Sequence, residues 1–195
     1  MGTPTPYQPH KLFVAALFGA ERTYESVLRL ITRDFGSVDA ALPPQPFDFS
    51  TYYDGEMGAG LRRTLFSIEA LVDPSALASL KQTANRIEHA TTDTPGSARV
   101  DTPDGRPRRT VNLDPGLLSL SRVILATTKA SAHRIPLRDG LYAEITLLYR
   151  RGRYTAMEWT YPDYRSEAFL DWLGAVRRTY HEQLRRIDPS YPWRL

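Results

Sequence analysis

Apolar residues along this chain follow two patterns, and the first of them predicts strands. Residues 11–18 form a compact apolar run, and residues 65–72 alternate between apolar and polar side chains, as half-buried or fully buried strands do. A strand expected to begin at Arg109 ends at Asp114-Pro115-Gly116, a sequence that suits a type II turn. This strand therefore covers residues 109–113. Further strands are predicted at residues 47–49 and 133–137, and a hairpin around Gly152 is predicted from residues 141–150 and 154–159.

In the second pattern, apolar residues recur at the spacing of an α-helix. Three segments share it and place their apolar side chains on one face: residues 23–35, 73–88 and 166–186. Gly36 is a suitable end for the first helix, and Asp73 followed by Pro74 is a favourable start for the second. Residues 117–128 are apolar almost throughout, so they fit either a buried helix or a long strand.

The order of these elements predicts the fold class. Strand, helix, strand, strand, helix, strand is the order of a ferredoxin-like split βαβ unit, and a C-terminal hairpin and long helix extend it. We therefore predict an α+β fold with a mainly antiparallel sheet and helices packed largely on one face. A single domain is expected over residues 11–187, with a mobile N-terminal tail at 1–10, an exposed loop insertion at 90–107 and a C-terminal tail at 188–195.

Composition narrows the classes of function. The chain has 195 residues, of which 42% are apolar, and this is enough for one full-sized core. It contains no cysteine, which excludes disulfides, thiolate zinc sites and thiol nucleophiles. No apolar run reaches the length of a membrane span, and the N-terminus does not have the pattern of a signal peptide. A cytoplasmic protein is the expectation.

The net charge of +3 is unevenly distributed. Residues 1–100 have a net charge of −2 and residues 101–195 a net charge of +5, and arginine outnumbers lysine 22 to 3. This balance permits an anionic ligand but does not demand nucleic acid. RNA binding through the arginine-rich half is the weakest option, because the aromatic motif of an RNA-recognition sheet and the GXXG loop are both missing.

Familiar catalytic and cofactor motifs are absent from the sequence. There is no phosphate loop, dinucleotide fingerprint, HExxH, GxSxG or EF-hand loop. No metal site is therefore predicted, and no cofactor is indicated. On the second predicted helix, Lys81, Asn85 and Glu88 form a polar stripe beside the apolar one, and we interpret this stripe as a solvated face.

The most informative stretch of the chain is residues 108–147, because polar and charged side chains lie inside or beside its apolar segments. Burying a charge is costly unless it is paired or engages a ligand. The stretch is therefore either a structural ion-pair network or a pocket for an anion, and the sequence leaves both readings open. The side chains concerned are Arg109, Asn112, Asp114, Lys129, His133, Arg134 and Glu144.

His133 and Glu144 form the candidate pair for acid–base chemistry. If the strands that hold them are neighbours, either His133 or Arg134 can meet Glu144 across the sheet. A histidine beside a carboxylate suits general acid–base catalysis, and it suits a structural network equally well. The candidate catalytic residues are His133, Glu144 and Asp114.

Two aromatic segments outside this stretch carry further candidates. Asp48, Tyr53 and Glu56 belong to a loop that can contact a substrate, although an aromatic-anchored turn is the favoured reading. Asp163 and Arg165 follow the predicted hairpin and either pin the last helix or border the same pocket. The candidate ligand-binding residues are Lys129, Arg134, Arg109, Asn112, Asp48, Tyr53, Glu56, Asp163 and Arg165.

Six motifs occur in one order along the chain: KLFVAALF, FDFSTYYDGEMG, VNLDPG, TTKASAHRI, GLYAEITLLY and WTYPDYR. In these motifs the sequence resembles the bacterial and archaeal family known as domain of unknown function 4416, over nearly all of residues 11–180. The resemblance implies little chemistry. It implicates Asp48, Tyr53, Glu56, Asn112, Asp114, Lys129, His133, Arg134, Glu144, Asp163 and Arg165.

The function expected from the sequence is a pocket for an anionic, phosphorylated or carboxylated small molecule, with or without catalysis. The alternative is a non-catalytic adaptor or assembly subunit, in which the polar cluster is structural. In that case the proline-rich ends and the aromatic C-terminus, Tyr191 and Trp193, bind a protein partner. A concave cluster of the candidate residues would favour the pocket, and a large exposed apolar surface would favour the adaptor.

Overall fold

The structure is a computed structural model that describes residues 2, 3, 5–92 and 109–189. The predicted loop insertion therefore lies almost entirely outside the described residues, as do Tyr191 and Trp193. The last residues of the predicted N-terminal tail belong to the fold, because His10 opens the first strand and the carbonyl of Pro9 accepts a hydrogen bond of 2.7 Å from the Tyr180 hydroxyl.

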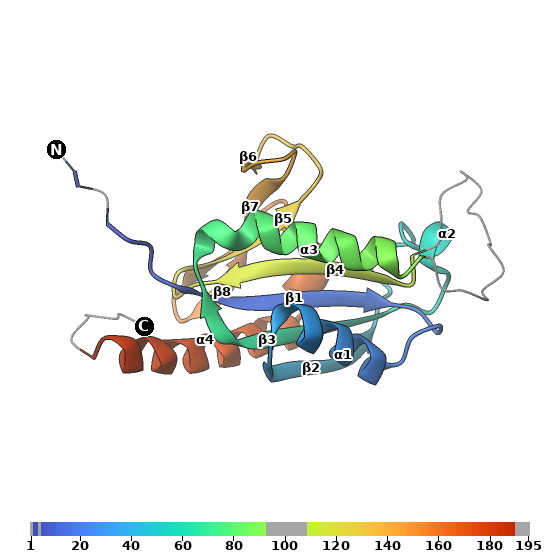
Figure 1. Cartoon of the computed structure of the whole chain (residues 1–195), viewed down its shortest axis with the longest axis horizontal. Coiled ribbons are helices and arrows are strands. Elements are labelled where there is room, and N and C mark those ends of the chain that lie inside the picture. The colour runs from blue at the N-terminus through green and yellow to red at the C-terminus, as the bar shows by residue number, and fades with distance from the viewer. Residues whose placement is uncertain (1, 4, 93–108, 190–195) are drawn as a thin grey trace.

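One antiparallel sheet organises the described part of the chain (Figure 1). Its strands are β1 (His10–Phe18), β2 (Val38–Pro46), β3 (Arg62–Val72), β4 (Val111–Leu118), β5 (Arg122–Thr127), β6 (Ile135–Pro136), β7 (Tyr142–Arg150) and β8 (Arg153–Ala156). The helices are α1 (Tyr24–Phe35), α2 (Asp54–Met57), α3 (Leu77–Ala90) and α4 (Glu167–Ile187), with short 3₁₀ turns η1 (Pro74–Ala76) and η2 (Pro162–Arg165).

The strand order confirms the predicted α+β class and its split βαβ core. The sheet runs β2-β3-β1-β4-β5-β7-β6, and β8 pairs with β7. The first four strands in this order, joined by α1 and α3, have the arrangement of a ferredoxin-like unit. Strands β5 to β8 extend the sheet beyond β4, and the hairpin of β7 and β8 and the long helix α4 were both predicted.

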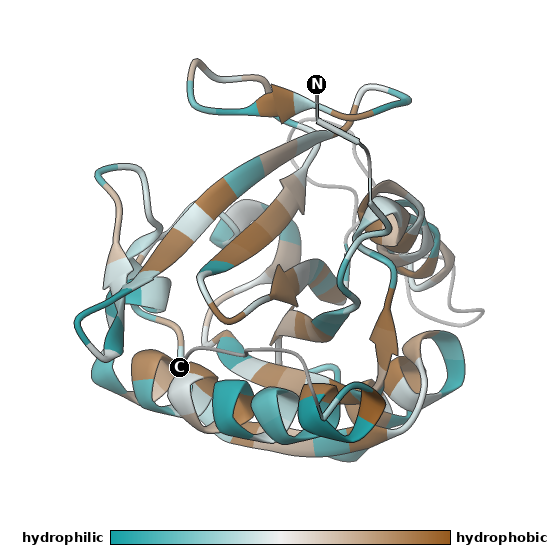
Figure 2. Cartoon of the chain, turned by 90° about the vertical axis from the view of Figure 1, so that its left-hand side faces the viewer, coloured by the Kyte–Doolittle hydropathy of each residue, from teal (hydrophilic) through white to brown (hydrophobic). Residues whose placement is uncertain are grey.

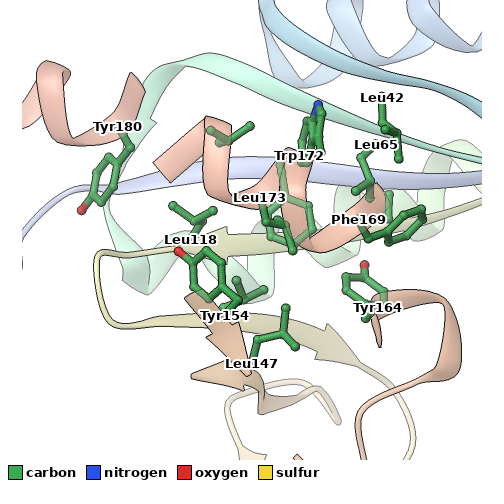
Figure 3. Close-up of a cluster of buried hydrophobic side chains, with 14 of the residues drawn as sticks. Leu42, Leu65, Leu118, Leu147, Tyr154, Tyr164, Phe169, Trp172, Leu173 and Tyr180 are labelled. Atoms are coloured by element: carbon green, nitrogen blue, oxygen red, sulfur yellow. The ribbon is translucent and has the colours of Figure 1, made fainter. Parts of the chain in front are cut away.

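Helices cover both faces of the sheet, so the prediction that they pack largely on one face is wrong. All nine residues of β1 are buried because the strand is covered on both sides. Leu12 and Val14 pack with residues of α1 and α3, whereas Phe13 and Ala15 pack with residues of α4. The hydrophobic residues are concentrated on the central strands (Figure 2), and Figure 3 shows the cluster on the α4 side.

Strand β2 was not predicted, and one strand that was predicted is absent. Strand β2 was missed because its sequence contains Pro43, Pro44 and Pro46, which a strand tolerates only at the edge of a sheet, where β2 lies. The strand expected at residues 47–49 is instead a loop. Residues 117–128 are neither one helix nor one strand, because β4 ends at Leu118, the chain turns, and β5 follows.

The predicted turn at Asp114-Pro115-Gly116 is wrong, since all three residues lie inside β4. Gly116 is required there by packing and not by a turn. A Cβ atom at this position would lie 2.3 Å from Cζ of Phe13 and 2.8 Å from Cδ2 of Leu125. The strand predicted at residues 133–137 is also shorter than expected, since β6 comprises Ile135 and Pro136 alone.

None of the helices in the described ranges has both the length and the apolar character that crossing a membrane requires.

Candidate functional site

The sheet opens between β4 and β5, and this opening forms the site. Strand β4 begins at Val111 and β5 continues to Thr127, yet the two strands pair only where residues 116–118 face residues 123–125. Beyond the last pair, Pro115 has no N–H to offer to a neighbouring strand. The backbone of Leu113 therefore needs partners other than β5.

Two charged side chains of α3 supply these partners. Lys81 Nζ donates to the Leu113 carbonyl at 2.8 Å, and the Leu113 N–H donates to Glu88 Oε1 at 2.8 Å. Both side chains are buried, with exposed fractions of 6% for Lys81 and 5% for Glu88. The prediction that they form a solvated face with Asn85 is wrong, because the gap in the sheet draws them inward. Asn85 is half-buried.

A cavity of about 810 Å³ occupies this opening. Its lining comes from β4, β5 and α3, from Glu144 of β7, from η2 and from the segment that joins β2 to α2. Ligand pockets of small molecules have volumes in this range. The cavity therefore lies where elements from both faces of the sheet meet.

A chain of ion pairs forms the floor of the cavity. Arg63 Nε lies 3.2 Å from Asp163 Oδ2, and Arg63 Nη1 lies 3.4 Å from Asp114 Oδ2. Lys81 Nζ lies 3.2 Å from Asp114 Oδ1 and 3.8 Å from Glu88 Oε1. Three carboxylates and two cations are thus paired with one another within the lining.

Arg109 extends this network to the segment before β3. Its guanidinium contacts Glu56 in a two-pronged arrangement, with Nε 2.5 Å from Oε1 and Nη2 2.7 Å from Oε2. Its Nη1 lies 2.5 Å from Glu88 Oε2 and 3.0 Å from Asn112 Oδ1. Asn112 in turn donates to Asp114 at 2.8 Å. Arg109 therefore ties the α2 segment to α3 and β4.

The two floor aspartates differ in their electrostatic surroundings. Burial by itself raises the pKa of Asp114, but Lys81 and Arg63 outweigh burial, so the pKa is lowered and the carboxylate is held ionised. For Asp163, burial is the stronger influence and raises the pKa, against the opposing pull of Arg63. Burial also raises the pKa of Tyr53, whose hydroxyl stays neutral.

Glu144 forms a second polar group at the other side of the opening. Its carboxylate is buried, and its Oε2 lies 2.7 Å from Arg134 Nε and 3.4 Å from His133 Nε2. Arg134 also donates to the carbonyl of Lys129 at 2.8 Å and to the hydroxyl of Tyr161 at 2.9 Å. The contact across β6 and β7 that the sequence predicted is present, and Arg134 fixes the loop that carries Lys129.

His133 stands outside the lining and is stacked on an aromatic ring. Its imidazole lies 4.8 Å from the ring of Trp159 with an angle of 12° between the two planes. The indole N–H of Trp159 donates to the carbonyl of Ile145 at 2.8 Å. The stacking on Trp159 and the contact of Nε2 with Glu144 thus hold the His133 ring in place.

Aromatic side chains form one wall of the cavity. The rings of Phe47 and Tyr53 lie 6.0 Å apart, and those of Tyr52 and Tyr53 lie 5.1 Å apart, both in edge-to-face arrangements. The segment that bears these rings is therefore an aromatic-anchored turn and also part of the lining. The other aromatic lining residues are Phe49, Tyr161 and Tyr164.

Lys129 differs from the other cations of the lining. Its Nζ lies 3.2 Å from the hydroxyl of Tyr52 and 4.2 Å from the centre of that ring. Within the described ranges of the chain it has no carboxylate partner, whereas Arg63, Lys81 and Arg109 each have at least one. Lys129 is exposed, so its charge is available to a ligand.

Comparison with known protein families identifies a match to this sequence. A family model described as domain of unknown function (DUF4416) matches residues 8–180 of the 195 residues. The chain belongs to the DUF4416 family. Comparisons with curated proteins and with solved structures gave no match. All cavity residues of this DUF4416 protein lie within the matched range.

The structure brings together most of the residues that the sequence singled out. Eight of the candidates line the cavity: Tyr53, Glu56, Arg109, Asn112, Asp114, Lys129, Glu144 and Asp163. His133 and Arg134 lie behind the lining, in contact with Glu144. Asp48 is exposed and outside the lining. Arg165 points to backbone carbonyls of residues 157, 158 and 160, so it holds the connector in place.

Sequence reasoning missed four residues that shape the site in this DUF4416 chain. Lys81 and Glu88 were assigned to the solvent, and Arg63 preceded the first residue of the predicted strand. Tyr164 was not singled out from its aromatic segment. The helical spacing of Lys81 and Glu88 on the face beside the apolar stripe was the available signal. Among the described residues no group of three or more histidine, aspartate or glutamate side chains is arranged to hold a metal ion.

Proposed function

We propose that the cavity binds a small molecule that carries an anionic group, a phosphate or a carboxylate. The observation that carries this proposal is Lys129. Among the described residues, it is the cation of the cavity lining that has no carboxylate partner, and it is exposed. An anion at Lys129 would gain a charge-assisted hydrogen bond without breaking an ion pair of the floor.

Burial of polar groups also supports a ligand. The hydroxyl of Tyr164 is buried and forms no hydrogen bond with the described residues, although the guanidinium of Arg63 lies 5.8 Å from the centre of its ring. Buried polar atoms are nearly always paired in native proteins, so an unpaired hydroxyl on a residue of the lining is suited to a ligand or to water. Tyr164 is one of the residues that line the cavity, whose volume fits a small molecule.

The geometry supports binding better than catalysis. Asp114 is held ionised by two cations and by Asn112, so its carboxylate has little capacity to take up a proton. His133 is outside the lining. The catalytic roles predicted for His133, Glu144 and Asp114 therefore do not form part of this proposal, and we assign Glu144 to holding Arg134 in place.

Thermal unfolding with and without ligand tests the proposal. Phosphate, acetate and phosphate monoesters are added to the wild-type protein and to Lys129→Ala. At ten times the dissociation constant a ligand stabilises the folded state by about 1.4 kcal/mol, which for a chain of this size is about 3–6 °C. We expect this increase in the wild-type protein and its loss in Lys129→Ala.

The matched control is Arg138→Ala, which removes an exposed cation outside the cavity that contacts Ser79. This variant should respond to anions as the wild-type protein does. A wild-type protein that no anion stabilises, or a Lys129→Ala variant that responds as strongly as wild type, would remove the basis of the proposal.

A further inference from the structure

We propose that the ligand has one anionic group on an uncharged, ring-bearing body, and that it binds with the anion at Lys129 and the body against the aromatic wall. This inference rests on the proposed function and specifies the chemical class of the ligand. It depends on three features of the cavity: the balance of charge in the lining, the position of the aromatic rings and the polar groups that lack partners.

The described part of the lining offers no second unpaired lysine or arginine to a further anionic group. Its cations are Arg63, Lys81, Arg109 and Lys129, and its carboxylates are Glu56, Glu88, Asp114, Glu144 and Asp163. Three of these four cations are already engaged by carboxylates at 2.5–3.4 Å. A second anion further inside would face the carboxylates without an unpaired lysine or arginine among the described residues, and like charges at close range repel. A polyphosphate therefore fits the cavity poorly.

The free cation and the aromatic wall are adjacent. Lys129 Nζ lies against Tyr52, whose ring packs on Tyr53, and Tyr53 packs on Phe47. Phe47 and Phe49 continue the wall at 5.8 Å between ring centres. A ligand that places its anion at Lys129 therefore has its next atoms beside aromatic rings. Flat rings are favoured there, because aromatic pairs gain energy beyond the burial of area.

Two further residues of the lining, Tyr164 and Asn85, carry polar groups that can serve the body of the ligand. The Tyr164 hydroxyl is buried without a hydrogen bond, as described above. Asn85 of α3 is half-buried in the lining, and its amide makes no hydrogen bond within the described part of the chain. Neutral hydrogen-bonding groups recognise neutral polar atoms, so the body of the ligand is expected to carry such atoms but no second charge.

The test compares simple probes that separate these features. Binding to the wild-type protein is measured by calorimetry with phenyl phosphate, inorganic phosphate, tripolyphosphate and phenol. We expect phenyl phosphate to bind at least ten times more tightly than inorganic phosphate or phenol, and tripolyphosphate to bind no more tightly than inorganic phosphate. Tripolyphosphate as the tightest ligand, or phenyl phosphate no tighter than inorganic phosphate, would overturn the inference.

Two variants assign the two parts of the ligand to their residues. Lys129→Ala should reduce the affinity for phenyl phosphate to that for phenol. Phe49→Ala, at a ring that is 46% exposed and so tolerant of truncation, should weaken phenyl phosphate at least threefold and change inorganic phosphate less than twofold. Equal losses for both probes in Phe49→Ala would contradict the assigned orientation.

The failure of this inference can be told apart from failure of the proposed function. If anions bind at Lys129 but their affinity rises with the number of charges, the site is an anion site and the ligand class is wrong. If neither phosphate nor phenyl phosphate binds to the wild-type protein, both the proposed function and the inference fall.

Discussion

Lys81→Met is the substitution that best tests how the opening in the sheet is held together. Methionine has a side chain of similar length but no ammonium group, so the substitution removes both the charge and its hydrogen bonds. The buried ammonium group of Lys81 contacts the carbonyl of Leu113 at 2.8 Å, Asp114 at 3.2 Å and Glu88 at 3.8 Å. All three partners would lose their contact with Lys81 at once.

The cost follows from the charges left behind. Removing one partner of a buried ion pair costs about 3–5 kcal/mol, because the other charge stays buried without compensation. Asp114 keeps Arg63 at 3.4 Å and Asn112 at 2.8 Å, which places the expected loss near the lower end of that range. For a chain of 195 residues, a loss of about 3 kcal/mol lowers the melting temperature by about 6–12 °C.

Urea unfolding at 25 °C, followed by circular dichroism, measures this loss. The matched control is Lys129→Met, which removes the exposed lysine of the same cavity and should change the free energy of unfolding by less than about 0.5 kcal/mol. If Lys81→Met cost less than about 1 kcal/mol, or no more than Lys129→Met, the contacts that Lys81 makes at the Leu113 backbone and its two carboxylates would not be a source of stability.

Three further predictions concern stability. Gly116→Ala should destabilise the protein by about 1–3 kcal/mol in urea unfolding, because the added methyl group overlaps two core side chains, whereas Gly174→Ala, with no atom within 4 Å, should stabilise the long helix by about 0.5–1 kcal/mol. The pKa of Asp114 is lowered from 3.8 in the folded state, so the stabilisation by this carboxylate is complete above pH 3.8 and is lost as the pH falls through the folded pKa. Asp114→Asn should therefore destabilise the protein at pH 7 and reduce the loss of stability at acidic pH. Asp163→Asn should cost less, because the pKa of Asp163 is raised in the folded state. Arg134→Ala should cost about 3 kcal/mol in thermal or urea unfolding, because it leaves a buried carboxylate without its closest cation, and an unchanged melting temperature would count against this role.

Local patterns predicted the elements whose character is decided within their own sequence. The continuous apolar run of β1 and the helical spacing of α4 each identify an element that is buried whatever its neighbours are. The contact between Arg134 and Glu144 was also predictable, because the two residues lie on segments that follow each other and pair across the sheet. Short separations along the chain leave few alternatives.

Features that depend on distant partners could not be read in this way. Strand β2 is a strand because it pairs with β3 at the sheet edge, although its prolines argue against one. Lys81 and Glu88 occupy helix positions that usually face water, and they are buried because β5 turns away from β4 beside them. The sequence of the helix contains no pattern that indicates the gap between β4 and β5. Asp114 and Asp163 of the cavity floor were therefore predicted, whereas Lys81, Glu88 and Arg63 were not.

A crystal structure of the protein with phenyl phosphate bound would test the proposed binding of an anion at Lys129 most directly. We expect the phosphate within hydrogen-bonding distance of Lys129 Nζ, the phenyl ring against Phe47 and Tyr53, and the ion pairs of Arg63 and Arg109 unbroken. A cavity that stays empty at saturating ligand, or a phosphate that displaces the carboxylates from Arg63 or Arg109, would contradict this expectation.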